Sequence, residues 1–254
     1  MAVTIKSDRE IELMREAGRI LAIVHKELEK AVKPGISTKD IDNLGEEIIR
    51  SYGCIPSFLN YNGYPASICV SVNDEVVHGI PSKDRILLDG DIVSLDAGVI
   101  YKGYHSDAAR THAVGEISAE AKKLIEVTKQ SFFEGIKFAK EGNHLFEISE
   151  AIGRYAESFG YGVVRDLVGH GIGSNLHEDP QIPNFKQRRR GLKLQAGMTL
   201  AIEPMINIGR YDVEWLDDDW TVVSEDGSLS AHYENTVLIT TGEPELLTMY
   251  ENTL

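Results

Sequence analysis

The chain has 254 residues, with 26 Lys and Arg against 40 Asp and Glu, and a formal net charge of −14 at pH 7. Its hydrophobic content of 42% and charged content of 26% are typical of a globular enzyme and unlike those of a disordered chain. The acidic balance argues against sequence-specific or general nucleic-acid binding, which relies on Lys and Arg to neutralise phosphates.

Two helices are predicted in the first half of the chain, and the second half repeats the plan. Ser7 with Glu10 forms a capping-box pattern before an apolar series at helical spacing that ends near residues 34–35. A second helix is predicted from Ser37 to near Gly53. The corresponding helices of the second half are predicted over residues 119–140 and 145–159.

Short β-rich runs lie between and after these helix pairs, at residues 67–72, 92–100, 199–208, 221–224 and 235–240. Paired helices separated by mainly antiparallel strands indicate an α+β fold rather than a doubly wound sheet. Because no Pro/Gly/Ser-rich linker divides the chain, we expect a single domain over 1–254 with internal halves at about 1–115 and 116–254.

A faint internal repeat relates the two halves. At a single offset of 107 residues it matches Gly35 with Gly142, Gly53 with Gly160, Gly90 with Gly197 and Asp96 with Glu203. Chance matches of glycine are common, but one offset maintained without a gap predicts a duplication. Equivalent strands of the two halves would then each deliver one carboxylate to a shared interface.

The compartment is indicated by the cysteines and by the hydropathy pattern. Cys54 and Cys69 have neither zinc-knuckle nor CxxC spacing, so two free thiols in a reducing compartment are a simpler interpretation than one disulfide. The first residues contain no apolar signal region, and no run approaches 18 apolar residues. We therefore expect a cytoplasmic protein without membrane contact.

Five potential metal ligands are scattered through the chain: Asp96, Asp107, His170, Glu203 and Glu234. The two aspartates can face one side of a hairpin that turns near residues 103–104. Glu203 stands in an otherwise apolar strand, where a charge is costly to bury unless a cation compensates it. Taken singly, the aspartates fit exposed turns, His170 a structural role, and Glu203 an exposed strand edge beside Pro204.

Taken together, the five residues indicate metal chemistry. Four carboxylates gathered at one place repel one another and hold protons near neutral pH. Two divalent cations would balance this charge and make a bridging water acidic enough to act as hydroxide. From the residues alone, such a site suits hydrolysis of an amide or a phosphate ester, and it does not suit a structural zinc.

Six segments occur in order over nearly the whole chain: AsnAspGluValValHisGlyIlePro (73–81), AspGlyAspIleValSerLeuAsp (89–96), TyrHisSerAsp (104–107), GlyHisGlyIleGlySerAsnLeuHisGluAspProGlnIlePro (169–183), IleGluProMet (202–205) and SerAlaHisTyrGluAsn (230–235). In these segments the chain resembles the type I methionine aminopeptidases of metallopeptidase family M24, in their short bacterial-type form. The resemblance implies the pita-bread α+β fold, with pseudo-two-fold duplicated halves, an antiparallel sheet and two helix pairs. It also implies removal of the initiator methionine from newly made proteins when the second residue is small, by a monomer.

Matched position by position, the resemblance implies a site for two divalent cations, which the ligand types allow to be Co, Mn, Fe, Ni or Zn. Asp96 would bind one cation and His170 the other. Asp107 and Glu234 would bridge both, and Glu203 would complete the coordination of the second.

The resemblance also implies catalytic and substrate-binding residues. Glu203 would act as the general base, His78 would hydrogen-bond the substrate amide, and His177 would polarise the carbonyl and stabilise the tetrahedral intermediate. A pocket for the methionine side chain would be formed by Phe58, Tyr61, Tyr64, Cys69, His78, His177 and Trp220. Aromatic walls suit a thioether, which interacts favourably with rings.

Two other interpretations remain. An aminopeptidase P or prolidase relative shares the fold and ligands but typically carries a large additional N-terminal domain, whereas this chain begins with the first helix of the catalytic fold. A catalytically inactive pita-bread protein used as a binding module would have lost ligands that are present here. A transient ribosome contact, if made, is expected at the basic stretch 186–190, because the acidic loop 212–219 would repel RNA.

Overall fold

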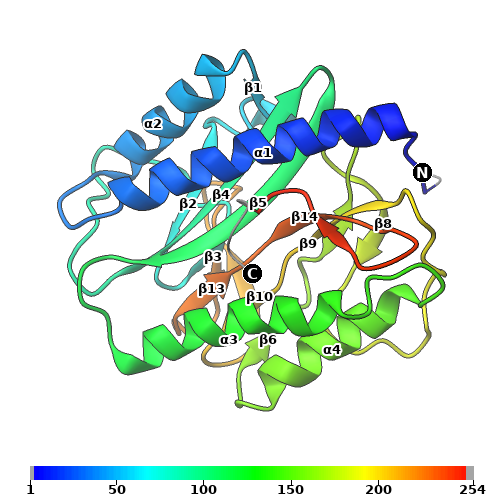
Figure 1. The fold of residues 1–254 in the computed structure, drawn as a ribbon. Helices are drawn as coiled ribbons and strands as arrows, with labels where there is room; N and C mark the ends of the chain where they lie inside the picture. Colours follow the sequence, from blue (N-terminus) through cyan, green and yellow to red (C-terminus); the bar gives the residue numbers. More distant parts are fainter. Residues whose placement is uncertain (1–2, 250–254) are drawn as a thin grey trace.

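The computed structural model describes residues 3–249, and two pairs of helices lie on opposite sides of the strands (Figure 1). The first pair is α1 (Asp8–Ala31) and α2 (Thr38–Ser51), and the second is α3 (Ala119–Ile136) and α4 (Leu145–Glu157). In the first half, α1 packs on β4 (Ile92–Tyr101) and β5 (Tyr104–Ala113), and α2 packs on β2 (Ile68–Val72). The predicted α+β arrangement is confirmed.

The helices begin where local capping favours them. Ser7 caps α1 in a capping box, with its backbone N–H donating to Glu10 Oε2 at 2.7 Å. Ser37 caps α2 in the same way, accepting from the backbone N–H of Asp40 at 3.1 Å. Helix α3 ends four residues earlier than predicted, because Phe138 and Ala139 donate to carbonyls three residues back and tighten the last turn.

All strand pairs in the four sheets are antiparallel. The first half forms the sheet β1-β4-β2, with β5 also paired to β4, and the second half forms β15-β14-β9-β7-β8. Two three-stranded sheets, β13-β10-β6 and β11-β12-β3, complete the fold, together with the 3-10 helix η1 (Tyr61–Gly63). The strands not yet bounded are β1 (Ile55–Pro56), β3 (Glu75–Val77), β6 (Gly162–Val163), β7 (Gly169–Gly171), β8 (Glu178–Ile182), β9 (Thr199–Ile202), β10 (Met205–Asn207), β11 (Val213–Trp215), β12 (Val222–Ser224), β13 (Ser230–His232), β14 (Asn235–Leu238) and β15 (Glu245–Leu246).

Two details of the predicted strands differ in the structure. The predicted strand 199–208 is divided into β9 and β10 at Glu203-Pro204, since proline has no N–H to donate to a ladder. The hairpin between β4 and β5 turns at Lys102-Gly103 rather than one residue later, because Tyr101 pairs with Tyr104. Both turn residues have positive φ, 48° and 88°, as a tight hairpin turn requires.

The predicted duplication is visible in the placement of equivalent elements. Helix α2 begins at Thr38 and α4 at Leu145, and strand β4 begins at Ile92 and β9 at Thr199. Each of these pairs has the offset of 107 residues found in the sequence. The matched glycines also share a backbone conformation, with φ of 91° and 92° at Gly35 and Gly142, and 97° and 89° at Gly90 and Gly197.

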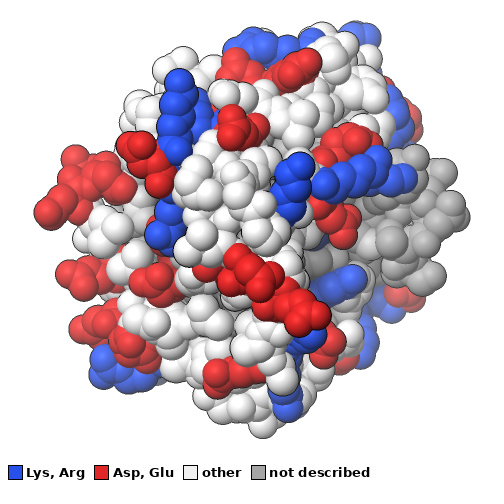
Figure 2. Space-filling model, turned by 90° about the vertical axis from the view of Figure 1, so that its left-hand side faces the viewer, with Lys and Arg blue, Asp and Glu red and all other residues white. Residues whose placement is uncertain are grey.

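Five hydrophobic clusters form the core of the described residues: one lies under α1 and α2, one under α3 and α4, and three contain residues of both halves. The one that contains Met14 is called the joining cluster. The joining cluster includes Met14, Tyr64 and Cys69 from the first half and Ile172 and Ala201 from the second. Within the described residues, no helix combines the length and hydropathy needed to cross a bilayer. On the face drawn in Figure 2, Lys and Arg side chains are interspersed with Asp and Glu over its described part.

Candidate metal centre and active site

The first half contributes two carboxylates from one hairpin. Asp96 of β4 lies opposite Ala109, and Asp107 of β5 lies opposite Gly98. Cross-strand partners share a face and alternate residues along a strand do too, so both aspartates point to the same side as diagonal neighbours. The same-side prediction is therefore confirmed, although the turn itself lies one residue earlier than expected.

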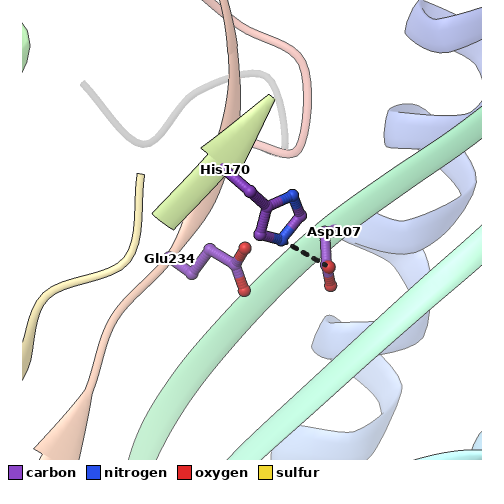
Figure 3. A group of neighbouring side chains, drawn as sticks. All are labelled: Asp107, His170 and Glu234. Carbon is purple, nitrogen blue, oxygen red and sulfur yellow. Dashed lines mark ion pairs between the residues drawn. The ribbon is translucent and has the colours of Figure 1, made fainter. Parts of the chain in front are cut away.

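The second half brings the other three residues to that face. His170 lies in β7, Glu203 follows the last residue of β9, and Glu234 directly precedes β14. In Figure 3 the side chains of Asp107 from β5, His170 from β7 and Glu234 from the segment before β14 converge, and ligand atoms of these three all lie within 4.8 Å of one another. His170 Nε2 is 3.8 Å from Asp107 Oδ2 and 3.7 Å from Glu203 Oε1.

Burial makes this cluster electrostatically unfavourable without a cation. Desolvation raises the pKa of Asp96 to about 7 and that of Glu203 to about 8. Desolvation followed by repulsion from neighbouring carboxylates raises the pKa of Asp107 and of Glu234 well above their ordinary values. Burial lowers the pKa of His170 to about 3, so its imidazole is neutral and able to bind a metal.

The donor set fits divalent cations. Asp96 Oδ1, Asp107 Oδ1 and Glu234 Oε1 are buried and have no hydrogen-bond partner. Buried acceptors without partners are uncommon in folded proteins and call for an explanation. Arg110 is not the missing partner of these carboxylate oxygens, because its Nη1 donates to the backbone carbonyls of Ala109 and Glu234. Oxygen ligands with one imidazole are suited to divalent metal ions.

The five predicted ligands lie on the wall of a cavity of about 430 Å³. All seven residues predicted for the pocket line the same cavity: Phe58, Tyr61, Tyr64, Cys69, His78, His177 and Trp220. The rings of Tyr64 and Trp220 meet edge to face with centroids 5.1 Å apart. The structure thus gathers the whole predicted set, which spans residues 58 to 234, around one space.

His78 and His177, the two predicted catalytic histidines that are not metal ligands, reach the cavity from different segments of the chain. His78 follows β3 with φ of 60°, a left-handed conformation that is unusual for a residue with a side chain. Burial lowers its pKa to about 4, so its imidazole is neutral at pH 7. His177 is exposed at the cavity mouth, where Nδ1 and the Tyr61 hydroxyl are 2.7 Å apart in a hydrogen bond. Its ring also lies against His170, with centroids 4.2 Å apart.

One neighbour of the cluster was missed in the sequence. His232 is buried, and its Nε2 lies 3.4 Å from Glu203 Oε2. The only signal was its position two residues before Glu234 in a segment chosen for the glutamate. The apolar cavity residues Leu167 and Met205 were also missed, because nothing local distinguishes them from core residues.

A buried group of four carboxylates and one imidazole, beside an aromatic-lined cavity, defines a metal-dependent hydrolase. Residues 12–241 match the model of metallopeptidase family M24. A methionine aminopeptidase of Clostridium acetobutylicum is 59% identical, with 98% of this chain and 100% of that protein covered. The crystal structure of a methionine aminopeptidase from Thermotoga maritima superposes with a TM-score of 0.96 at 44% identity, covering 98% of this chain and 100% of that one. The chain belongs to metallopeptidase family M24 and, within it, to the methionine aminopeptidases, and its fold is the pita-bread fold.

The prolidase alternative shares this fold at a greater distance. An Xaa-Pro dipeptidase from Bacillus anthracis superposes with a TM-score of 0.79 at 27% identity. The match covers 98% of this chain but 63% of that protein. Since the methionine aminopeptidases match more closely and over their full length, neither the prolidase alternative nor an inactive binding module is favoured.

Proposed function

We propose that this chain removes the N-terminal methionine of polypeptides whose second residue is small, using two divalent cations. The observation that carries the proposal is the buried cluster of Asp96, Asp107, His170, Glu203 and Glu234 on the wall of an aromatic-lined cavity. The cluster supplies hydrolytic chemistry and the cavity supplies a place for an apolar side chain. Family membership directs both toward an amino-terminal methionine.

The ligands divide naturally between two cations. Asp96 would hold one cation, His170 and Glu203 the other, and Asp107 and Glu234 both. The central position of Asp107 and Glu234 is supported by their closeness to His170 and by their partnerless oxygens. Cations bound there would polarise the scissile carbonyl and lower the pKa of a coordinated water.

The protein's own groups manage protons and charge. Glu203 faces the cavity and has a raised pKa, so its carboxylate can take a proton from an attacking water and pass it to the leaving amine. His78, neutral at pH 7, is available to hydrogen-bond the substrate amide. His177, held by Tyr61, would donate to the carbonyl oxygen as negative charge develops on it.

Selectivity for methionine follows from an uncharged pocket. The Tyr64 hydroxyl donates to the carbonyl of Gly79 at 2.9 Å, so its ring presents carbon to the cavity. Burial raises the pKa of the Cys69 thiol well above its ordinary value and keeps it neutral. Together with Phe58 and Trp220, these walls favour a thioether over a polar or charged side chain.

Broader features complete the proposal. The chain would act as one catalytic domain over 1–254, with halves at about 1–115 and 116–254, as a monomer in the cytoplasm. A transient ribosome contact would use the stretch 186–190, where Lys186 and Arg188 to Arg190 are exposed. Co-sedimentation with ribosomes, compared between the wild type and a variant with Arg188 to Arg190 changed to Glu, tests that contact. Equal co-sedimentation would refute it.

Hydrolysis of Met-Gly-Met-Met, compared with Met-Leu-, Leu-Gly- and Ala-Pro-led peptides, tests the main proposal. The metal-free protein would be assayed before and after addition of Co(II), Mn(II), Fe(II), Ni(II) or Zn(II), with Asp107→Ala as the control. Metal-dependent release of methionine only before a small residue, and none by Asp107→Ala, is expected. Preferential cleavage before proline would indicate an aminopeptidase P relative, and absence of turnover by folded, metal-loaded protein would indicate a binding module.

A further inference from the structure

A buried ion pair lies just outside the active-site cavity. Lys6 Nζ is 2.7 Å from Glu178 Oε2, and the two side chains are only 5% and 6% exposed. Thr4 Oγ1 donates to the same carboxylate oxygen at 2.7 Å and also contacts Lys6 Nζ. The backbone N–H of Lys6 donates to the carbonyl of Gly197 at 2.8 Å, which fixes the segment that precedes α1.

Glu178 ends the loop 172–177 between β7 and β8, which contributes Leu176 and His177 to the cavity wall. It is the first residue of β8 and pairs with Gly171 of β7, next to His170. Its Oε1 accepts from the backbone N–H of Asn175 at 3.2 Å, across the turn that holds Leu176 and His177. The ion pair therefore ties the N-terminal segment to the hairpin that presents both histidines.

The loop packs directly on the ion pair. A Cβ added at Gly173 would lie 2.5 Å from Lys6 Cε and 2.6 Å from Glu178 Oε1, closer than atoms normally approach. The carbonyl of Gly173 in turn accepts from the backbone N–H of His105 at 2.8 Å. The loop is thus held between β5 and the Lys6–Glu178 pair.

His177 depends on this support. Its imidazole is exposed at the cavity mouth and is held there by the Tyr61 hydroxyl and by the face of His170. Those contacts orient the ring but do not fix the backbone that carries it. On the side next to His177 the backbone position is fixed by Glu178, which accepts from the backbone N–H of Asn175, while the bond of Gly173 to His105 holds the other side of the loop.

We propose that Lys6 and Glu178 are positioning residues that hold His177 at the place where the substrate carbonyl is polarised. Neither residue lines the cavity, so neither is placed to contact the methionine side chain or the cations. The inference rests on the proposed function, because the role of His177 comes from it. Removal of Lys6 would leave the buried carboxylate of Glu178 without a positively charged partner. The carboxylate would then turn toward water and displace the loop.

Loss of the ion pair between Lys6 and Glu178 should lower kcat more than it changes KM. His177 is assigned to charge that develops during reaction, and loss of such an interaction lowers kcat. His170 is held separately, because β7 also pairs with β9 and His170 lies opposite Ala201, so KM and cation binding should change little. Loss of a residue that orients a metal ligand typically costs 10- to 100-fold in activity, and we expect a similar factor for residues that orient His177.

The experiment compares Lys6→Met, Glu178→Gln and their double variant with Lys6→Arg, which keeps the charge. Arg15→Met is the matched control, because it breaks an ion pair of α1 with Glu245 that is 40% and 38% exposed and lies away from the cavity. For each variant we would measure kcat and KM on Met-Gly-Met-Met, cation binding by calorimetry, and the imidazole NMR signal of His177 in the metal-free protein.

We expect kcat to fall at least tenfold in Lys6→Met and Glu178→Gln, with KM within about twofold and a shifted or broadened His177 signal. The double variant should be no worse than the worse single variant, since both remove one shared interaction. Lys6→Arg should retain most of the activity, and Arg15→Met should match the wild type.

Wild-type kcat and an unchanged His177 signal in folded Lys6→Met or Glu178→Gln would overturn the inference, as would an equal loss in Arg15→Met. If those two variants do not fold, Thr4→Val decides, because it removes one hydrogen bond to Glu178 and leaves both charges. An unchanged His177 signal in Thr4→Val would then overturn the inference. Failure of the proposed function is recognised separately, as absence of methionine release by the wild type while the NMR signal still reports the loop.

Discussion

Replacement of Asp96 by Asn should stabilise the metal-free protein at alkaline pH while it weakens cation binding. The pKa of Asp96 is raised to about 7 from an ordinary value of 3.8, chiefly by burial. The folded protein therefore holds a proton on Asp96 between about pH 4 and pH 7 that the unfolded chain has lost. The stability associated with that proton is fully present below the unfolded pKa and is lost as pH rises through 7.

The size of the effect follows from the same shift. A folded pKa of about 7 against 3.8 corresponds to a loss on the order of 4 kcal/mol by pH 8. For a chain of this length, 1 kcal/mol corresponds to about 2–4 °C in Tm, so the upper limit for Asp96→Asn is about 8–16 °C. The observed gain should be smaller, because the Asn amide that replaces the carboxyl group must itself be buried.

Thermal unfolding followed by circular dichroism, with EDTA or with excess Mn(II), at pH 5 and pH 8, provides the assay. Metal-free Asp96→Asn should melt several degrees above the metal-free wild type at pH 8, and the difference should shrink at pH 5. Added Mn(II) should raise the Tm of the wild type more than that of the variant, and more at pH 8 than at pH 5. A metal-free variant that melts at or below the wild-type temperature at pH 8 would refute the electrostatic reasoning.

Three further predictions concern the pocket, an auxiliary histidine and a helix start. Trp220→Ala should lower kcat/KM for Met-Gly-Met-Met at least tenfold, because it removes an aromatic wall of the pocket. The loss for a Leu-Gly-led peptide should be smaller. Equal losses for the two peptides in steady-state assays would contradict a methionine pocket. His78→Ala should lower kcat by about 100-fold while cation binding measured by calorimetry is unchanged, and weaker cation binding would assign His78 to the metal site instead. Ser7→Ala should reduce the free energy of unfolding by about 1 kcal/mol in urea titrations with no change in kcat, and an unchanged urea midpoint would show that the capping box does not stabilise α1.

The helices were predictable because their signals are local. Capping residues and an apolar period lie within a few residues of each helix start, as at Ser7 and Ser37. Short strands were not predictable in the same way. Strand β7, from Gly169 to Gly171, is three residues long and contains two glycines, so it has neither a period nor a β propensity to detect. Strand β7 forms because it pairs with β9 and β8 in the folded chain. Nothing in the residues of β7 themselves records this pairing.

The candidate site was predictable as a list of residues and only partly as geometry. The chemistry of four carboxylates and one histidine could be recognised without knowing their positions. The diagonal placement of Asp96 and Asp107 followed from strand alternation. The break at Glu203 has a local signal in Pro204, but the approach of His232 to Glu203 could not be deduced, because it arises from the pairing of β10 with β13. Nothing within a few residues of His232 records that contact.

The ligands of the cluster come from both halves of the chain. Cations bound there would therefore hold the two halves together. Asp96 and Asp107 come from the first half, whereas His170, Glu203 and Glu234 come from the second. The full set of five ligands is assembled only when the halves are docked, so the full binding energy is available only then. By thermodynamic linkage, free cation concentration then sets how firmly the halves hold together. A substitution in the joining core, far from any ligand, can for the same reason weaken metal affinity without touching the metal.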